Sequence, residues 1–237
     1  MNILLDDISF KNSLFPFGVT RSMAHIRTGI LTILEKWQFY FPGKVFIASE
    51  NVSLSFNKSE WIQYPANFIP SFDFLQQVSF RKEKLPFTSD CKILEHPWQI
   101  FEYNDWAIRQ DFQMITECRV SAPIPSSCHT VSPENIFIEP GAQLDFSILN
   151  ADQGPIYIAE NAQIQEGCML RGPIVVGKQS RLKMGTKIYG ATTIGPNCLA
   201  GGEIKNSVLM GFSNKAHDGY LGDSVLGEWC NLGAGTS

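Results

Sequence analysis

The carboxy-terminal half of the chain carries an aliphatic residue at every sixth position. Seven consecutive steps fall on Ile158, Ile164, Leu170, Val176, Leu182, Ile188 and Ile194. Four residues after each of these stands a second set, small in six of seven cases: Ala162, Cys168, Ile174, Ser180, Thr186, Thr192 and Cys198. The pattern fades at Ala200 and returns at Leu226 and Leu232, and Ile138 and Leu144 form an earlier pair in the same phase.

A period of six matches neither the 3.6-residue repeat of a helix nor the two-residue repeat of a strand. It predicts short strands alternating with turns, so that the chain coils into a prism whose axis is filled by stacked aliphatic side chains. This pattern resembles the hexapeptide-repeat left-handed parallel β-helix. The alternative is an all-β sandwich with chance spacing, which two columns of consecutive matches disfavour.

The first half predicts a mixed α/β architecture. An apolar run at 3–5 ended by Asp6 and Asp7 is typical of a buried strand, and residues 44–48 form a second run of this kind. Between them, apolar positions spaced for one face predict a helix over 23–40, although Gly29 costs about 1 kcal/mol in a helix interior. Strand, helix and strand indicate a parallel βαβ unit. Residues 97–117 predict another helical segment, with a break near Asn104.

Composition divides the chain in two. Only three of the 19 glycines precede residue 141, whereas fourteen of the 17 phenylalanines precede residue 120. A Pro/Ser-rich stretch lies between these halves. We therefore expect an α/β domain at 1–119, a linker at 120–134 and a β-helix domain at 135–237.

Charge and cysteine content restrict the classes of function. The formal net charge of −4 argues against a nucleic-acid surface. No apolar run reaches the length of a membrane helix, and the amino terminus lacks the basic start of a signal peptide, so we expect a cytoplasmic protein. The six cysteines form no metal-binding spacing, and we expect them to be reduced and mostly buried. Cys168, Cys198 and Cys230 fall in the small inward column, which favours packing over catalysis.

The six-residue period is interrupted between residues 201 and 223, where we expect a loop that leaves the β-helix. Functional residues often lie on loops held by a rigid scaffold. His217 is suited to general base catalysis because imidazole titrates near neutral pH. Lys205 offers a cation for an anionic substrate, and Tyr220 and Asn231 offer neutral hydrogen bonds. Without its flanking motif, His217 would be interpreted as an ordinary loop histidine.

These residues stand in three motifs, Glu203-Ile204-Lys205-Asn206-Ser207, Lys215-Ala216-His217-x-x-Tyr220-Leu221-Gly222-Asp223 and Asn231-Leu232-Gly233-Ala234-Gly235-Thr236. Together they resemble the acetyltransferase half of bifunctional GlmU-type enzymes, which make UDP-N-acetylglucosamine from glucosamine 1-phosphate. The segment 213–231 is closer still to a variant group typical of Bacteroidetes-like bacteria. The resemblance covers residues 135–237.

The resemblance implies roles for individual residues. His217 matches the general base that takes a proton from the sugar amine as it attacks acetyl-CoA. Lys205 and Tyr220 match residues that hold the sugar phosphate, and Asn231 matches a residue near the sugar and the acyl group. Ala234 matches a backbone contact to acetyl-CoA. This chemistry is coherent because an amine held beside a base and the acyl carbon gains from proximity.

Two features depart from the family pattern. The family's phosphate-binding arginine is matched only by Lys183, at a spacing from Lys205 four residues longer than usual, and Arg171 is a rival cation. The chain also stops at Ser237, where family members continue for several coils that contribute to the acetyl-CoA pocket. We therefore expect a carboxy-terminally truncated chain whose acetyl transfer depends on the absent coils.

The amino-terminal segment 14–37 resembles the divergent sugar nucleotidyltransferase-like domain of the same variant group, but no glycine-rich phosphate loop is present. Arg21 and Arg27 stand at the start of the predicted helix, where anions bind well. Asp6 and Asp7 at a strand end could hold a magnesium–nucleotide complex. The alternative interpretation is equally open for each: solvated arginines and turn-forming aspartates. A domain of about 120 residues is also short for this activity and could be degenerate.

The sequence thus predicts a two-domain enzyme of sugar-nucleotide biosynthesis. Its expected reactions are nucleotidyl transfer to a sugar 1-phosphate, N-acetyl transfer from acetyl-CoA to an amino-sugar phosphate, or both, with Mg²⁺ accompanying the nucleotide and no metal site of its own. The resemblance implies a homotrimer with sites between subunits. Two alternatives remain open: nucleotidyl transfer alone, with the β-helix as a trimerisation stalk, and a non-catalytic binding or assembly protein.

Overall fold

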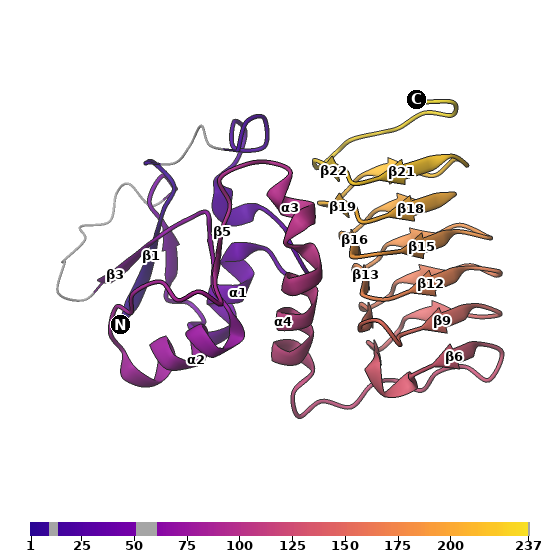
Figure 1. The fold of residues 1–237 in the computed structure, drawn as a ribbon, viewed down its shortest axis with the longest axis horizontal. Helices are drawn as coiled ribbons and strands as arrows, with labels where there is room; N and C mark the ends of the chain where they lie inside the picture. The colour runs from indigo at the N-terminus through magenta and orange to yellow at the C-terminus, as the bar shows by residue number, and fades with distance from the viewer. Residues whose placement is uncertain (10–13, 51–60, 237) are drawn as a thin grey trace. The chain divides into compact units, whose positions relative to one another are not determined.

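The computed structural model describes residues 1–9, 14–50 and 61–236. They form two compact units (Figure 1). The first comprises Met1–Arg27 and Leu31–Gln99, and the second comprises Thr28–Ile30 and Ile100–Ser237. The division falls after Gln99, so it does not coincide with the expected boundary at residue 119. The helical segment that follows Gln99 belongs with the β-helix.

The first unit contains a parallel sheet of the order β2-β1-β3, built from β1 (Asn2–Asp6), β2 (Val45–Ile47) and β3 (Trp61–Pro65). Ile3 pairs with Val45 on one side and with Ile62 on the other. The strand–helix–strand pattern is therefore confirmed as a parallel unit. Its remaining elements are the short helix η1 (Met23–His25), α1 (Ile33–Tyr40), α2 (Phe72–Arg81) and the antiparallel pair β4 (Phe68–Ile69) and β5 (Lys92–Ile93).

The predicted helix over 23–40 is wrong in its first half. After η1 the chain bends at residues 29–31, between the bridged residues Arg27 and Thr32. Helix α1 begins only at Ile33, where Thr32 caps the helix and Glu35 completes a capping box. Gly29 adopts a left-handed φ of +83° and donates its N–H to the Asn104 side chain at 2.7 Å. The segment around Gly29 thus bonds to a helix of the second unit, which it belongs to, and this outweighs its local helical pattern.

Aromatic side chains fill the core of the first unit. Trp37 of α1 stacks on Tyr64 with ring centroids 4.8 Å apart, and Phe68 and Phe74 surround the pair. All four are at most 2% exposed. Part of the phenylalanine-rich composition of the first half therefore reflects a packed core, whereas Phe15, Phe39 and Phe80 are exposed.

The second unit is a parallel β-helix with three faces, each a ladder of parallel strands (Figure 1). The first face consists of β7 (Ile136–Ile138), β10 (Ile156–Ile158), β13 (Ile174–Val176), β16 (Thr192–Ile194), β19 (Val208–Leu209) and β22 (Val225–Leu226). The second face consists of β8 (Gln143–Leu144), β11 (Gln163–Ile164), β14 (Arg181–Leu182), β17 (Leu199–Ala200) and β20 (Asn214–Lys215). The third face consists of β6 (His129–Val131), β9 (Ile148–Asn150), β12 (Met169–Arg171), β15 (Lys187–Tyr189), β18 (Glu203–Lys205) and β21 (Tyr220–Gly222). A short helix η2 (Pro133–Asn135) precedes β7.

Both inward columns predicted from the six-residue period are confirmed. Every member of the aliphatic column from Ile158 to Ile194 and of the small column from Ala162 to Cys198 is at most 3% exposed. Ile138 and Leu144 are buried in the same axial cluster. The axis is narrow, so each coil stacks its side chains directly on those of the coil before.

The expectation that residues 201–223 leave the β-helix as a loop is wrong. They include β18, β19, β20 and β21, all paired within the three ladders. The period is lost because the coils become shorter. Ile174 pairs with Thr192, 18 residues later, whereas Thr193 pairs with Val208, 15 residues later.

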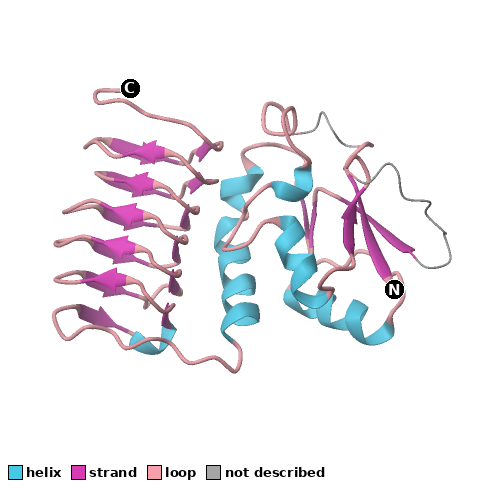
Figure 2. Ribbon diagram, turned by 180° about the vertical axis from the view of Figure 1, so that it is seen from behind, coloured by secondary structure: helices cyan, strands magenta, loops and turns pink. Residues whose placement is uncertain are grey.

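A helix covers the first face of the β-helix, within the second unit (Figure 2). After α3 (Gln99–Glu102), α4 (Asn104–Thr116) runs beside these strands, and the break near Asn104 is confirmed. Asn104 donates to the Ala191 carbonyl at 2.7 Å and accepts from the Thr193 hydroxyl at 3.1 Å. Val175 and Thr193 lie outside the axial cluster, yet they are at most 2% exposed.

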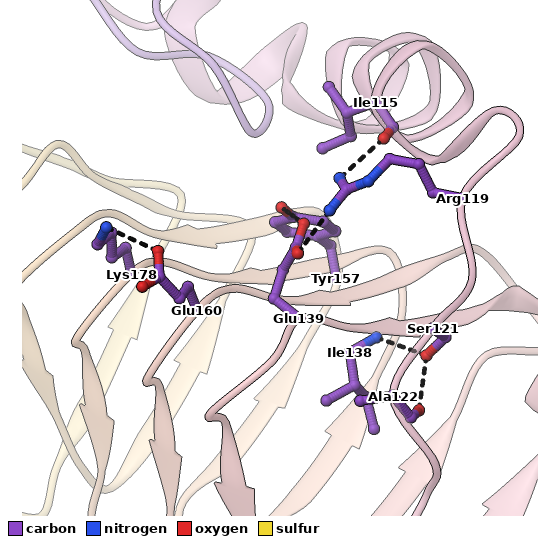
Figure 3. Close-up of polar contacts among 9 residues, drawn as sticks. All are labelled: Ile115, Arg119, Ser121, Ala122, Ile138, Glu139, Tyr157, Glu160 and Lys178. Atoms are coloured by element: carbon purple, nitrogen blue, oxygen red, sulfur yellow. Dashed lines mark hydrogen bonds and ion pairs between the residues drawn. The ribbon is translucent and has the colours of Figure 1, made fainter.

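An ion pair joins the end of the α4 segment to the first coil of the β-helix (Figure 3). Arg119 donates to Glu139 at 2.6 Å and to the Ile115 carbonyl at 3.0 Å, and the Tyr157 hydroxyl donates to the other Glu139 oxygen at 2.6 Å. Burial alone would raise the pKa of Glu139, but these two donors outweigh it and hold that pKa below its usual range. In the segment expected as a linker, Ser121 accepts from the Ile138 N–H and β6 is a strand of the third face.

The cysteines are all free thiols, but only Cys168 and Cys198 are buried, so the expectation that most are buried is wrong. Burial raises the pKa of the Cys168 thiol, which fits packing rather than nucleophilic chemistry. Among the helices of the described residues, none has the length and hydrophobicity to cross a membrane.

The axial column makes a quantitative prediction. Ile188 is 1% exposed, so Ile188→Ala should lower the free energy of unfolding by about 3 kcal/mol, through lost burial and the cavity left behind. The neighbouring exposed residue provides the control, because Lys187→Ala should change it by less than about 0.5 kcal/mol. Urea unfolding followed by circular dichroism measures both. Equal effects of the two substitutions would contradict the axial packing.

The Glu139 carboxylate predicts a pH-dependent stability. Its pKa is lower in the folded state, so its stabilisation is present above the ordinary value of 4.5 and is lost as pH falls through the folded-state pKa. Glu139→Gln should therefore cost about 1 kcal/mol at pH 7, a figure reduced by the 45% exposure of the Arg119 side chain, and much less near pH 3. Glu160→Gln, which removes a half-exposed partner of Lys178, is the control with little effect at either pH.

Candidate functional site

A cavity of about 370 Å³ lies in the first unit, at the carboxyl ends of β1 and β2. It is lined by Asp7, Ile8, Gly18, Val19, Thr20, Arg21, Ser22, Met23, Ser49 and Glu50. Two of the residues singled out from the sequence, Asp7 and Arg21, therefore come together in one cavity. Ligands of open parallel α/β sheets bind at the carboxyl ends of the strands, which is where this cavity lies.

Asp7 is 6% exposed and holds the turn that follows β2. Its two carboxylate oxygens accept from the Ser49 N–H at 3.0 Å and the Ser49 hydroxyl at 2.5 Å. Asp6 is directed elsewhere, as successive residues of a strand are. It accepts from the N–H groups of Ile8 and Ser9 and from the Gln63 side chain. The two aspartates expected to act as a pair therefore serve different turns.

Arg27 is not among the residues that line this cavity. Its guanidinium lies 3.3 Å from Glu35 in the first turn of α1. Burial alone would raise the pKa of Glu35, but Arg27 and the hydrogen bonds from Thr32 outweigh it and lower that pKa. Arg27 therefore stabilises the start of α1 together with the capping box.

Among the described residues that line the cavity, Asp7 and Glu50 carry carboxylates, and Glu50 lies 2.8 Å from the His25 ring. Mg²⁺ is commonly bound through one or two carboxylates together with substrate phosphates. The residues present therefore fit a metal that arrives with a nucleotide. Among residues 1–9, 14–50 and 61–236, no group of three acidic, histidine or cysteine side chains forms a metal site of its own.

The second candidate site lies at the corner between the second and third faces of the β-helix. Four residues, 183–186, separate β14 from β15 there, only two, Gly201 and Gly202, separate β17 from β18, and four, 216–219, separate β20 from β21. A Cβ at Gly201 would lie 2.3 Å from the Ala216 carbonyl oxygen, and one at Gly202 would lie 2.7 Å from that of Gly219. Because these two residues lack a Cβ, the backbone of the corner that carries His217 can pack directly against the backbone of the shorter corner.

His217 is exposed at this corner. Lys183 opens the corner two coils earlier, with only the short glycine corner between the two. Arg171, its rival, lies at the other edge of the third face, as the last residue of β12. Lys183 and His217 therefore lie along the same edge of the β-helix, two coils apart. Arg171 lies along the opposite edge of the third face, as Lys205 does.

Lys205 and Tyr220 are brought together by the pairing of β18 with β21. Lys205 pairs with Gly222, and Tyr220 pairs with Glu203. A Cβ at Gly222 would lie 2.2 Å from the Tyr220 hydroxyl oxygen, so the phenol ring lies across the Gly222 backbone, toward the position paired with Lys205. Gly222 was not recognised from the sequence as a residue of the site, although a glycine two positions after a tyrosine on one strand face is a usable signal.

A groove of about 510 Å³ lies on the third face below Lys205. The polar residues among those that line it are Asn150, Arg171, Lys187, Tyr189 and Glu203. The Tyr189 hydroxyl donates to Glu203 at 2.6 Å, and this bond is the main reason why the pKa of Tyr189 rises to about 12. Arg171 and Lys187 therefore give the groove a positive character.

The last two residues predicted for this site, Asn231 and Ala234, lie near the carboxy-terminal end of the described residues. Asn231 forms an isolated parallel bridge with Asn214 of β20, and Leu232 donates its N–H to the Asn214 carbonyl at 2.8 Å. Ala234 is exposed in the turn that follows. Asn231 continues the second face, whereas Lys205 and Tyr220 lie on the third, and His217 occupies the corner between these faces.

Comparison with known proteins finds a family that matches the first half of the chain and a set of similar curated proteins. A family model described as sugar nucleotidyl transferase matches residues 2–56 and 48–120. The bifunctional protein GlmU of Synechococcus elongatus is 32% identical over 111 residues, which covers 43% of this chain and 25% of that protein. GlmU of Rippkaea orientalis is 37% identical over 100 residues (41% and 19%), and GlmU of Paracoccus denitrificans is 42% identical over 71 residues (30% and 15%).

The chain thus spans a quarter or less of the length of these curated relatives. The family match covers half of the chain, including β1, β2 and the residues that line the cavity between them. On this evidence the chain belongs to the sugar nucleotidyl transferase family, whose members are transferases of sugar-nucleotide biosynthesis.

Proposed function

We propose that this chain transfers a nucleotidyl group to a sugar 1-phosphate in the cavity of the first unit. The observation that carries this proposal is that Asp7 and Arg21 line one cavity at the carboxyl ends of two neighbouring parallel strands. In this reaction a phosphate oxygen of the sugar attacks the α-phosphorus of a nucleoside triphosphate, and pyrophosphate leaves. Arg21 is suited to balance the charge that accumulates on the phosphoryl oxygens.

The side chains around Arg21 fit the rest of such a substrate. Thr20, Ser22 and Ser49 offer hydroxyl groups, whereas Val19 and Met23 offer apolar contact area. Asp7 and Glu50 would hold a magnesium ion that accompanies the triphosphate, and that ion would offset the phosphate charge. Since Asp7 also fixes the Ser49 turn, its carboxylate positions one wall of the cavity before any ligand binds.

A second activity is favoured by the arrangement of Lys205, Tyr220 and His217 on the β-helix. We propose that these residues serve N-acetyl transfer from acetyl-CoA to an amino-sugar phosphate such as glucosamine 1-phosphate, as the motifs that resemble GlmU-type enzymes suggest. Lys205 and the Tyr220 hydroxyl would hold the phosphate, with Lys183 or Arg171 as a further cation. Their ladder pairing supports this assignment, because it directs both side chains to one face.

The acetyl transfer step requires a neutral amine. The amine nitrogen attacks the thioester carbonyl carbon, and His217 accepts the proton released from nitrogen. The carbon–sulfur bond then breaks, and the thiolate of coenzyme A takes that proton from His217 and leaves as the free thiol. Asn231 and the backbone at Ala234 would contact the sugar and acetyl-CoA. These groups are exposed, so we propose that a homotrimer, with a neighbouring subunit against the uncovered second and third faces, encloses the site.

A thermal-shift panel tests these proposals. The ligands are UTP or dTTP with Mg²⁺, glucosamine 1-phosphate, N-acetylglucosamine 1-phosphate and acetyl-CoA. A ligand present at 100 times its dissociation constant adds about 2.7 kcal/mol of stability. We expect Arg21→Ala to remove the shift caused by nucleotide, and Lys205→Ala to remove the shift caused by glucosamine 1-phosphate. We also expect His217→Ala to abolish acetyl transfer, measured as release of free thiol.

Two matched variants serve as controls. Arg81→Ala removes an arginine of the first unit outside the cavity, and His129→Ala removes an exposed histidine of the third face. Nucleotide binding with no effect of His217→Ala would favour nucleotidyl transfer alone, with the β-helix as a stalk. No shift with any ligand would instead favour a binding or assembly protein and contradict both proposals.

The position of the Tyr220 ring makes a separate prediction. Gly222→Ala places a methyl group where the hydroxyl now lies, so the ring must move, and the KM for glucosamine 1-phosphate should rise about tenfold with little change in stability. Tyr220→Phe should have a similar effect. The effects of the two substitutions should not add in the double variant, because both remove the proposed hydrogen bond from the Tyr220 hydroxyl to the substrate phosphate. Gly211→Ala, where a Cβ meets only ordinary contacts of 3.4 Å or more, is the control. Full additivity in the double variant would overturn this explanation.

A further inference from the structure

A lysine occupies a position on the β-helix axis that other coils fill with an apolar residue. The ladder of the second face pairs Leu144 with Ile164, Ile164 with Leu182, Leu182 with Ala200, and Ala200 with Lys215. The first four belong to the axial hydrophobic cluster. Lys215 is 6% exposed, so its long side chain enters the same interior. The small side chain of Ala200, one coil below, leaves room for it.

The ammonium group of Lys215 donates to three backbone carbonyls and, within the described part of the chain, to no carboxylate. The acceptors are the carbonyl oxygens of Gly201 at 3.0 Å, His217 at 2.7 Å and Gly219 at 3.0 Å. Three donors and three acceptors match, so the group has a fixed orientation. Burial lowers the pKa of Lys215, and the nearby Asp218 partly offsets this.

Such an arrangement is costly as a purely structural device. A buried charge must recover its lost hydration from its partners, and replacing buried charged groups by apolar ones is often neutral or stabilising. An aliphatic residue would continue the column at this position. Departures of this kind from the pattern of a fold concentrate at functional sites.

The three acceptors identify what Lys215 holds. Gly201 belongs to the short corner, whereas His217 and Gly219 belong to the corner above it. The ammonium group thus ties the two corners together and fixes the peptide groups that follow His217 and Gly219. The backbone that carries the His217 imidazole is held at the carbonyl of His217 itself and again two residues later.

We propose that Lys215 is a positioning residue that holds His217 in the orientation needed for general base catalysis. This inference rests on the proposed acetyl transfer. Lys215 touches no reacting atom in this role. It acts through the backbone of the His217 corner. An aliphatic residue at this position would pack on the axis and stabilise the coil, but it would not order that corner.

Lys215→Met tests the proposal, because methionine preserves the length and the burial of the side chain but removes the charge and the three donors. We expect kcat for acetyl transfer to fall at least tenfold, while the KM values for acetyl-CoA and glucosamine 1-phosphate change less than twofold. The thermal midpoint should be unchanged or higher. Amide hydrogen exchange in a peptide spanning 216–220 should be at least tenfold faster. Lys178→Met, which removes a lysine that is 54% exposed at another corner, should change none of these quantities.

The outcomes separate this inference from the function on which it rests. If the wild type transfers no acetyl group, the proposed acetyl transfer is wrong, and if His217→Ala transfers it as fast as the wild type, the proposed role of His217 as general base is wrong. If His217→Ala is inactive but Lys215→Met keeps its kcat or its slow hydrogen exchange, the positioning role is wrong. A fall in kcat that accompanies an equal loss of thermal stability would also overturn it, since Lys215 would then be needed for the fold.

Discussion

The narrow axis of the β-helix is the constraint on which the rest of the second unit depends. Each coil must place side chains of matching size on those of the coil before, and parallel pairing requires all three faces to stay in register. Eighteen residues per coil satisfy both demands when every sixth residue is aliphatic. The outer surface is free of this constraint, so its composition varies from the polar second face to the positive groove on the third.

The candidate site arises where the constraint is relaxed. Shorter coils after residue 193 bring a two-residue glycine corner beneath a four-residue corner, and this difference in length leaves His217 at the surface. Loss of the aliphatic side chain at Ala200 creates space on the axis, and Lys215 fills it with a charge. The same two coils therefore carry residues that pack on the axis and residues proposed to act in catalysis.

In both units the backbone directs neighbouring residues of the chain to different sides. In the first unit, Asp6 and Asp7 point to different sides, and only Asp7 reaches the cavity with Arg21. In the second unit, Ile204 enters the axis while Lys205 stays on the outer face. The first face of the β-helix is the exception, because α4 covers its outer side and both sets of residues are buried.

The sequence by itself determined the β-helix, since a six-residue period over two columns admits few other ways to bury those side chains. It also indicated β1, β2 and the motif residues from Lys205 to Asn231. The tertiary structure alone decided where α1 begins, because Gly29 bonds to Asn104, 75 residues away, and no local pattern encodes that contact. It also decided that Arg21, and not Arg27, reaches the cavity, that Gly222 underlies Tyr220, and that Lys215 lies inside. Each of these features depends on a residue from another coil or element. No periodicity in the sequence indicates how far along the chain that residue lies.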